Sequence, residues 1–362
     1  MGPRSGAVGM NGPLAAFGTA PRHERMERIR RSPQFRDGAF QNPVPSALIT
    51  PGLFWNSLRR QFSGGEQRVP PGALPIVSLT AADFAVPPVS GLSVTWLGHS
   101  TVLVEIDGYR VLIDPVWGLR VSPSQLVGPR RFHPPPLPLR DLPRLDAVIV
   151  THDHYDHLDM AAVKAIAASP TQQHTQWITA LGVGAHLDAW GIPANRTTEL
   201  DWGDSAHLGA LTITAQPARH FSGRAFRRNQ TLWASWVIAG PQHRVFHSGD
   251  TGYFDGLAAI GERHGPFDLT MIKIGAYDVT WPVIHLDPEG AVRVHAMLRG
   301  ATLLPLHWGT FNLAFHAWNE PPERLLAAAA RENVRTLIPR PGERVEPAAA
   351  PPPDTWWRRV SA

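Results

Sequence analysis

Three histidines and two aspartates lie within six residues, directly after a short apolar run. The run covers residues 147–150, and the polar segment follows as Thr151-His152-Asp153-His154-Tyr155-Asp156-His157. Charged side chains at the end of a buried strand need water, a partner or a metal ion. The spacing lets His152 and His154 face one position while Asp156 and His157 turn towards a second. Such a pattern can hold two metal ions about 3.5–4 Å apart, and a polar loop with chance histidines is the weaker interpretation.

Three further candidate ligands each follow another apolar run. His220 comes after residues 211–215, Asp250 after residues 244–247, and His307 after residues 303–306. Because α/β sheets usually bind ligands at the carboxyl ends of their strands, we expect these side chains to meet the first cluster. The chain has no cysteine and 17 histidines, so a metal must be held by imidazole and carboxylate. The predicted metal ligands are His152, His154, Asp156, His157, His220, Asp250 and His307.

The elements that must position these residues alternate between strand and helix. Early strands are expected at residues 94–97, 101–106 and 109–113, with a hairpin turn at Asp107-Gly108. One helix is expected to have Asp287 as its N-cap, Pro288 at its first position and Gly300 at its C-terminal end. Early antiparallel strands followed by alternating strands and helices predict a layered, mixed α/β fold. Other expected elements are strands at 147–150, 211–215, 232–239, 244–247, 269–274, 302–306 and 336–338, and helices at 160–168 and 322–332.

The 362 residues suit one large domain with tails. We expect a flexible basic arm over residues 1–45, a main domain over 46–345, and a Pro/Ala-rich tail over 346–362 that Trp356 and Trp357 could anchor. The net charge of +4 arises within the first 31 residues, where six arginines face two glutamates, so the rest of the chain is neutral. A neutral body without a basic stripe argues against nucleic acid as a partner.

No apolar run approaches the length of a membrane span, and no apolar segment follows the N-terminal arginines as in a secretory signal. We therefore expect a cytoplasmic protein, with peripheral contact to a membrane through the basic arm as a second option. The oligomeric state stays open.

Several long runs resemble the metallo-β-lactamase superfamily and, within it, the N-acylphosphatidylethanolamine-hydrolysing phospholipase D family. They are V-T-W-L-G-H-S-T-V-L-V-E from Val94, L-I-D-P from Leu112, S-P-S-Q-L-V-G-P-R-R-F from Ser122, D-A-V-I-V-T-H-D-H-Y-D-H-L-D from Asp146, S-G-D-T-G-Y from Ser248, F-D-L-T-M-I-K-I-G-A-Y from Phe267, H-L-D-P-E from His285 and L-H-W-G-T-F from Leu306. The resemblance covers about residues 93–322 and implies that the main domain is an αββα sandwich. It also implies a zinc-dependent hydrolase with two Zn²⁺ ions; Mn²⁺ and Fe²⁺ are alternatives, because the same ligands suit them.

The resemblance also implies a role for each site residue. His152, His154 and His220 would hold one metal ion, Asp156, His157 and His307 the other, and Asp250 would bridge them. A hydroxide between the metals would attack a phosphodiester, such as that of a phospholipid, and Asp156 would orient this hydroxide as a catalytic residue. Tyr155 and His285 match positions that contact the phospholipid, and His285 is also predicted to be catalytic. His285 lies just before the helix expected at Pro288, whose N-terminus favours an anionic phosphate.

Three positions depart from the phospholipase D pattern. Asp278 stands where that family has an arginine, Lys273 where it has a proline, and Leu126 where it has an aromatic residue. These departures leave the metal ligands intact and alter the surroundings of the substrate. Two alternatives therefore stay open: a lactonase or other ester hydrolase, similar to ascorbate-6-phosphate lactonase-like enzymes, and a metal-binding protein without catalysis.

Two further residues, Asp114 and His99, are not among the predicted ligands. Asp114 could hold a ligand histidine through its second ring nitrogen, or it could simply form the turn before Pro115. His99 is matched in the family, but the sequence suggests no role for it.

Overall fold

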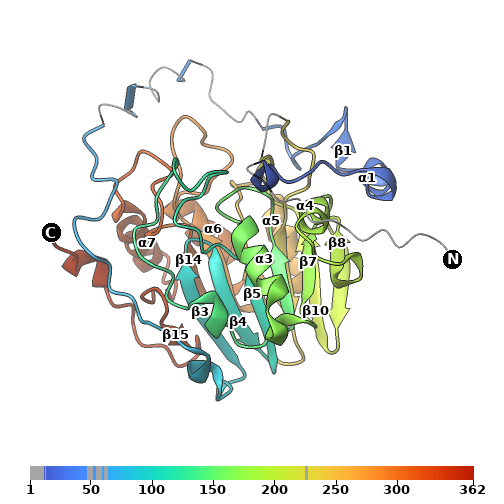
Figure 1. Cartoon of the computed structure of the whole chain (residues 1–362). Helices are drawn as coiled ribbons and strands as arrows, with labels where there is room; N and C mark the ends of the chain where they lie inside the picture. The colour runs from blue at the N-terminus through green and yellow to red at the C-terminus, as the bar shows by residue number, and fades with distance from the viewer. Residues whose placement is uncertain (1–11, 13, 47–51, 54–58, 61–63, 225–226) are drawn as a thin grey trace.

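Two β-sheets form the centre of the protein (Figure 1). The computed structural model describes residues 12, 14–46, 52–53, 59–60, 64–224 and 227–362. The seven-stranded sheet has the order β15-β3-β4-β5-β6-β7-β8, and the six-stranded sheet has the order β14-β13-β12-β11-β10-β9. The strands of the first sheet are β3 (Leu92–Gly98), β4 (Thr101–Ile106), β5 (Tyr109–Ile113), β6 (Ala147–Val150), β7 (Gln176–Ala180), β8 (Thr197–Leu200) and β15 (Arg344–Val345). Those of the second are β9 (Ser205–Leu208), β10 (Leu211–Gln216), β11 (Ser235–Ala239), β12 (Arg244–His247), β13 (Phe267–Lys273) and β14 (Gly300–Leu306).

Helices lie on the outer faces of the two sheets (Figure 1). The first sheet is covered by α3 (Met160–Ala168) and α4 (Gly184–Ala189), and the second by α5 (Gly256–His264), α6 (Pro288–Met297) and α7 (Glu320–Arg331). Every residue of β3, β4 and β6 is buried, as expected for strands that are covered on both faces. The predicted layered, mixed α/β sandwich is confirmed.

Most of the candidate ligands follow strands that pair in parallel with a neighbouring strand. β5, β6, β7 and β8 run parallel to one another, and so do β12, β13 and β14. Parallel strands end at the same edge of a sheet, so the loops after β12 and β14 come together. The loop after β6, in the other sheet, lies beside them, because Nε2 of His157 is 3.5 Å from Oδ1 of Asp250. The turn between β3 and β4 reaches this edge too, because the backbone N–H of His307 donates to the carbonyl oxygen of His99 (3.0 Å).

Some predicted boundaries were wrong. The side chain of Asp287 caps α6 by accepting from the Gly290 N–H, as expected, but the helix ends at Met297 rather than at Gly300. Arg299 takes the left-handed conformation (φ 58°) that reverses the chain, and Gly300 is already the first residue of β14. The strand expected over 232–239 begins only at Ser235, and in place of the strand expected at 336–338 there is one isolated bridge between Leu303 and Thr336.

Part of the segment predicted to be a flexible arm packs against the domain. Residues His23–Arg31 form α1, which is followed by the short hairpin of β1 (Phe35–Arg36) and β2 (Ala39–Phe40). Ile29 of α1 is fully buried, and Arg25 pairs with Glu199 and Asp188. Arginine charge in this segment therefore neutralises an acidic surface of the protein itself. The division of the chain at residues 45 and 345 stays a prediction.

The tail is anchored as its tryptophans suggested. Trp356 and Trp357 are buried, and Trp356 stacks on Trp308 with ring centroids 5.4 Å apart. The Trp357 indole N–H donates to Glu323 of α7 (2.7 Å). Within the described part of the chain, no helix is both long enough and apolar enough to cross a bilayer.

Candidate metal centre

The first group of predicted ligands forms a compact set of imidazole nitrogens. Nε2 of His152 lies 2.9 Å from Nδ1 of His154, which in turn lies 3.2 Å from Nε2 of His220. Two nitrogens that bind one tetrahedral zinc ion at 2.0–2.1 Å are about 3.3 Å apart. These three side chains, carried by the loops after β6 and β10, can therefore share one metal ion.

The second group gathers around a carboxylate oxygen of Asp156. This oxygen lies 3.3 Å from Nε2 of His307 and 3.5 Å from Nε2 of His157. Asp250 lies between the two groups: its Oδ1 is 3.5 Å from His157 Nε2, and its Oδ2 is 3.2 Å from His307 Nε2 and 3.6 Å from His220 Nε2. The structure thus brings all seven predicted ligands together, with Asp250 in the position expected of a bridge.

Several of these atoms are buried without any hydrogen-bond partner. They include Nε2 of His157, Nε2 of His307 and Oδ1 of Asp250. Unpaired buried polar atoms are costly, and each needs an explanation. All three atoms point into the same cluster of nitrogen and oxygen donors, so a metal ion at this place would satisfy them. The residues fit a metal centre of imidazole and carboxylate ligands.

The outer ring nitrogens of the ligands are held by neighbouring groups, which orients the rings. Asp114 is fully buried, and its Oδ2 lies 2.6 Å from Nδ1 of His157. Its carboxylate also accepts from the backbone N–H (2.8 Å) and the hydroxyl (2.9 Å) of Thr151. Thr151 Oγ1 also lies 2.9 Å from Nδ1 of His152. Of the two roles considered for Asp114, the structure supports the one that positions a ligand histidine.

Comparisons with known proteins agree with this geometry. The sequence profile described as the β-lactamase superfamily domain matches residues 109–308, more than half of the chain. An uncharacterized protein of Mycobacterium tuberculosis is 49% identical over 337 residues, which cover 91% of this chain and 88% of that protein. The N-acyl-phosphatidylethanolamine-hydrolyzing phospholipase D 1 of Caenorhabditis elegans is 40% identical over 283 residues, 75% of this chain and 78% of that protein. The chain belongs to the metallo-β-lactamase superfamily.

Solved structures of hydrolases share the fold of this superfamily member. The metallo hydrolase Igni18 of Ignicoccus hospitalis matches with a TM-score of 0.53 and 24% identity, over 70% of this chain and 97% of that one. The isothiocyanate hydrolase from Delia radicum gut bacteria matches with a TM-score of 0.55 and 22% identity, over 70% of this chain and 98% of that one. The superfamily resemblance inferred from the sequence motifs is confirmed, and the superfamily match together with the 40% identical hydrolase supports a metal-dependent hydrolase.

Five of the seven candidate ligands favour the protonation states that metal binding needs. His157 is an exception: burial alone would lower its pKa, but the carboxylates of Asp250 and Asp156 outweigh burial and raise it well above 6.5, so a metal ion must displace its proton. Burial lowers the pKa values of His152 and His220 well below the usual 6.5, and it also lowers that of His154. Burial alone would raise the pKa values of Asp156 and Asp250, but the nearby histidines and, for Asp250, Lys273 outweigh burial and bring both values well below 3.8. Neutral imidazoles and ionised carboxylates are the forms that bind metal ions.

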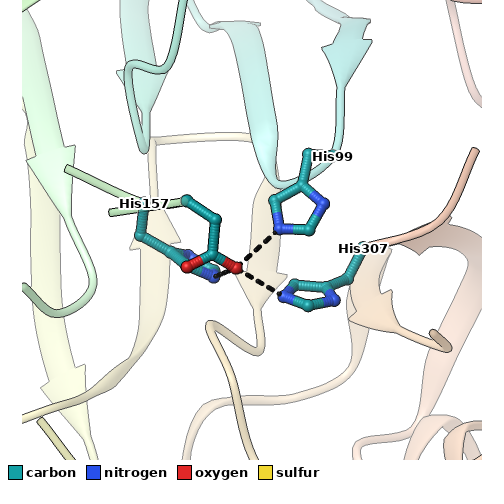
Figure 2. Close-up of side chains that lie close together, drawn as sticks. His99, His157 and His307 are labelled. Atoms are coloured by element: carbon teal, nitrogen blue, oxygen red, sulfur yellow. Dashed lines mark hydrogen bonds and ion pairs between the residues drawn. The ribbon is translucent and has the colours of Figure 1, made fainter. Parts of the chain in front are cut away.

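Sequence reasoning gave His99 no role, yet the structure places it beside the second group. His99, His157 and His307 surround the carboxylate of Asp156 (Figure 2), and Nε2 of His99 lies 2.9 Å from Asp156 Oδ2. His99 occupies the turn between β3 and β4 with φ 54°, so its backbone takes a left-handed conformation. The sequence signal was the Gly98-His99-Ser100 turn between two strands, which ends at the same sheet edge as the ligands.

A cavity of about 280 Å³ adjoins the cluster. His285 lies on its wall, with Nδ1 3.8 Å from Asp250 Oδ2, and its side chain is 13% exposed. His285 also lines a second cavity of about 460 Å³, which extends towards the start of α6. Besides ligand side chains and His285, the first cavity is lined by Phe221, Arg228, Ala276, Trp281, Ile284 and Leu313.

Tyr155, the other predicted substrate contact, does not line the cavity next to the cluster. Its hydroxyl donates to the backbone oxygen of Arg224 (2.7 Å), and the Arg224 guanidinium lies over its ring at 4.0 Å. Tyr155 instead lines a separate cavity of about 110 Å³. The structure therefore separates Tyr155 from His285, and the role of Tyr155 in substrate binding stays a prediction.

Proposed function

We propose that this chain is a dinuclear zinc hydrolase that cleaves a phosphodiester bond in a phospholipid of the N-acylphosphatidylethanolamine type. The observation that carries the proposal is the position of Asp250, whose carboxylate lies between the two groups of ligands. Its Oδ2 is 3.6 Å from Nε2 of His220 in the first group and 3.2 Å from Nε2 of His307 in the second. Two zinc ions bound there would activate water near neutral pH and offset negative charge on phosphoryl oxygens. The phospholipase D of Caenorhabditis elegans, 40% identical to this chain, supports the choice of substrate.

The cavity next to the cluster suits an anionic group attached to an apolar one. Phe221, Trp281, Ile284 and Leu313 offer apolar surface to an acyl chain. Arg228 lines the same cavity and carries a positive charge that would attract a phosphate. The related family has an arginine at the position of Asp278, and in this chain Arg228 would supply the positive charge instead. Asp278 forms an ion pair with Arg60 in the neighbouring cavity (2.7 Å).

The proposal is tested by incubating the purified, zinc-loaded protein with two sets of substrates. One set contains N-acylphosphatidylethanolamines and other phosphodiesters, and the other contains lactones and simple esters. We expect release of phosphatidic acid from the first set and two zinc ions per chain by elemental analysis. Turnover of lactones alone would support the lactonase alternative, and zinc binding without any turnover would support the non-catalytic one; either result contradicts the proposal.

Leu313→Ser is expected to raise KM for a long-chain N-acyl phospholipid about tenfold. The substitution removes one apolar side chain from the cavity wall, and burial of a leucine is worth about 1.5–3 kcal/mol. The rate with bis(p-nitrophenyl) phosphate, which has no acyl chain, should stay unchanged. Leu126→Ser is the matched control, because Leu126 is 86% exposed and does not line this cavity. Equal KM values for the two variants with the lipid would show that this wall does not bind the acyl chain.

A further inference from the structure

A buried lysine contacts the predicted catalytic histidine. Lys273, the last residue of β13, is fully buried, and Lys164 is the only other lysine in the chain. Its ammonium group donates to the carbonyl oxygen of Gly275 (3.0 Å) and contacts Nδ1 of His285. An isolated charge in a protein core is costly, so a fully buried lysine needs partners that use its donors. Both partners belong to the segment that forms the wall next to the metal centre.

The contact determines which nitrogen of His285 carries the proton. A lysine ammonium has three N–H donors and no acceptor, so Nδ1 of His285 must accept the hydrogen bond. A neutral imidazole that accepts at Nδ1 carries its proton on Nε2. Nδ1 of His285 also faces Oδ2 of Asp250 at 3.8 Å, and the contact with the Lys273 ammonium is the closer of the two.

We infer that Lys273 is a positioning residue that fixes His285 as the Nε2–H tautomer, so that His285 donates a hydrogen bond to an anionic oxygen of the substrate. This inference rests on the proposed function for the identity of that oxygen, a phosphoryl oxygen. His285 suits this task because it lines the cavity that adjoins the ligands as well as the larger cavity beside it. Lys273 stands where the related phospholipase D pattern has a proline. Its contact with His285 is therefore a feature in which this chain differs from that pattern.

The test compares Lys273→Met, which keeps an unbranched side chain one atom shorter and removes its donors, with Lys273→Gln, which keeps a neutral donor. In ¹⁵N spectra of the full-length, zinc-loaded protein with labelled histidines, wild-type His285 should show an unprotonated Nδ1 and a protonated Nε2. The resonances of His285 are identified by their loss in His285→Asn. Lys273→Met should give a mixture of tautomers and lower kcat about tenfold with KM unchanged, and Lys273→Gln should restore both. Lys164→Met, on α3, is the matched control and should behave as wild type.

Metal content and thermal midpoint are measured for every variant. An unchanged His285 signature in Lys273→Met would overturn the inference. Loss of zinc from that variant would overturn it too, since Lys273 would then act on the metal centre rather than on His285. If the wild-type protein hydrolyses no phosphodiester, the proposed function fails, yet the ¹⁵N spectra still decide whether Lys273 sets the tautomer.

Discussion

Asp250→Asn is expected to leave no more than one metal ion per chain and to reduce hydrolysis at least about 10³-fold. Both oxygens of Asp250 face ligand nitrogens, 3.5 Å from His157 and 3.2 Å from His307. Asparagine replaces one of these oxygens with an NH₂ group, which donates hydrogen bonds and cannot bind a cation. Losing a metal that stabilises developing charge by several kcal/mol corresponds to a rate loss of this size, since each 1.36 kcal/mol changes the rate tenfold. Metal per chain is measured by elemental analysis, and the rate with the best phosphodiester substrate.

Asp255→Asn is a suitable control for this variant. Asp255 lies five residues further along the same connection and is exposed, and its carboxylate accepts from the Tyr253 hydroxyl (3.2 Å). The same chemical change there should leave metal content and rate as in the wild type. If Asp250→Asn kept two metal ions and its activity, the two groups of ligands would not depend on a shared carboxylate. The dinuclear centre proposed for this chain would then be wrong.

The sequence could indicate which side chains gather in this cluster because much of the information is local. A run of candidate ligands such as residues 152–157 needs only a strand before it, and the apolar residues 147–150 provide that strand. His220, Asp250 and His307 could be added because each follows an apolar run, and parallel strands end at a common edge. The structure brings these side chains together, while their role as ligands stays a prediction.

Other features depend on contacts between distant segments, which a sequence does not show. His99 reaches Asp156 across 57 positions, and only the pairing of strands reveals that the β3–β4 turn ends at the metal centre. Tyr155 is next to two candidate ligands in sequence, yet its ring turns to Arg224 and away from their cavity. Similarly, the composition of residues 1–45 indicated a solvated arm, but Arg25 has partners at Asp188 and Glu199.

The second large effect is expected for Asp114→Asn, which should weaken metal binding by the Asp156–His157–His307 group about 10–100-fold. This is the usual cost of losing a residue that orients a ligand. Asp114 accepts from Nδ1 of His157 (2.6 Å), so that Nε2 is free to face the cluster. An asparagine NH₂ group at that place would donate to Nδ1 and leave the proton of His157 on Nε2, the atom that should bind the metal. If the amide turned the other way, its NH₂ group would face the backbone N–H of Thr151, which is also a donor.

Metal affinity is measured by competition with a chelator, which distinguishes a tightly bound metal ion from a weakly bound one. Because His157 belongs to the second group only, the His152–His154–His220 group should lose less affinity in Asp114→Asn. Asp107→Asn is the matched control: Asp107 lies 2.6 Å from Nδ1 of His243 in the same kind of contact. It lies at the opposite end of β5 from Asp114, about 20 Å away at 3.3 Å per residue. Equal losses of both ions in Asp114→Asn would mean that Asp114 supports the whole loop, and no loss at all would mean that the orientation of His157 does not limit metal binding.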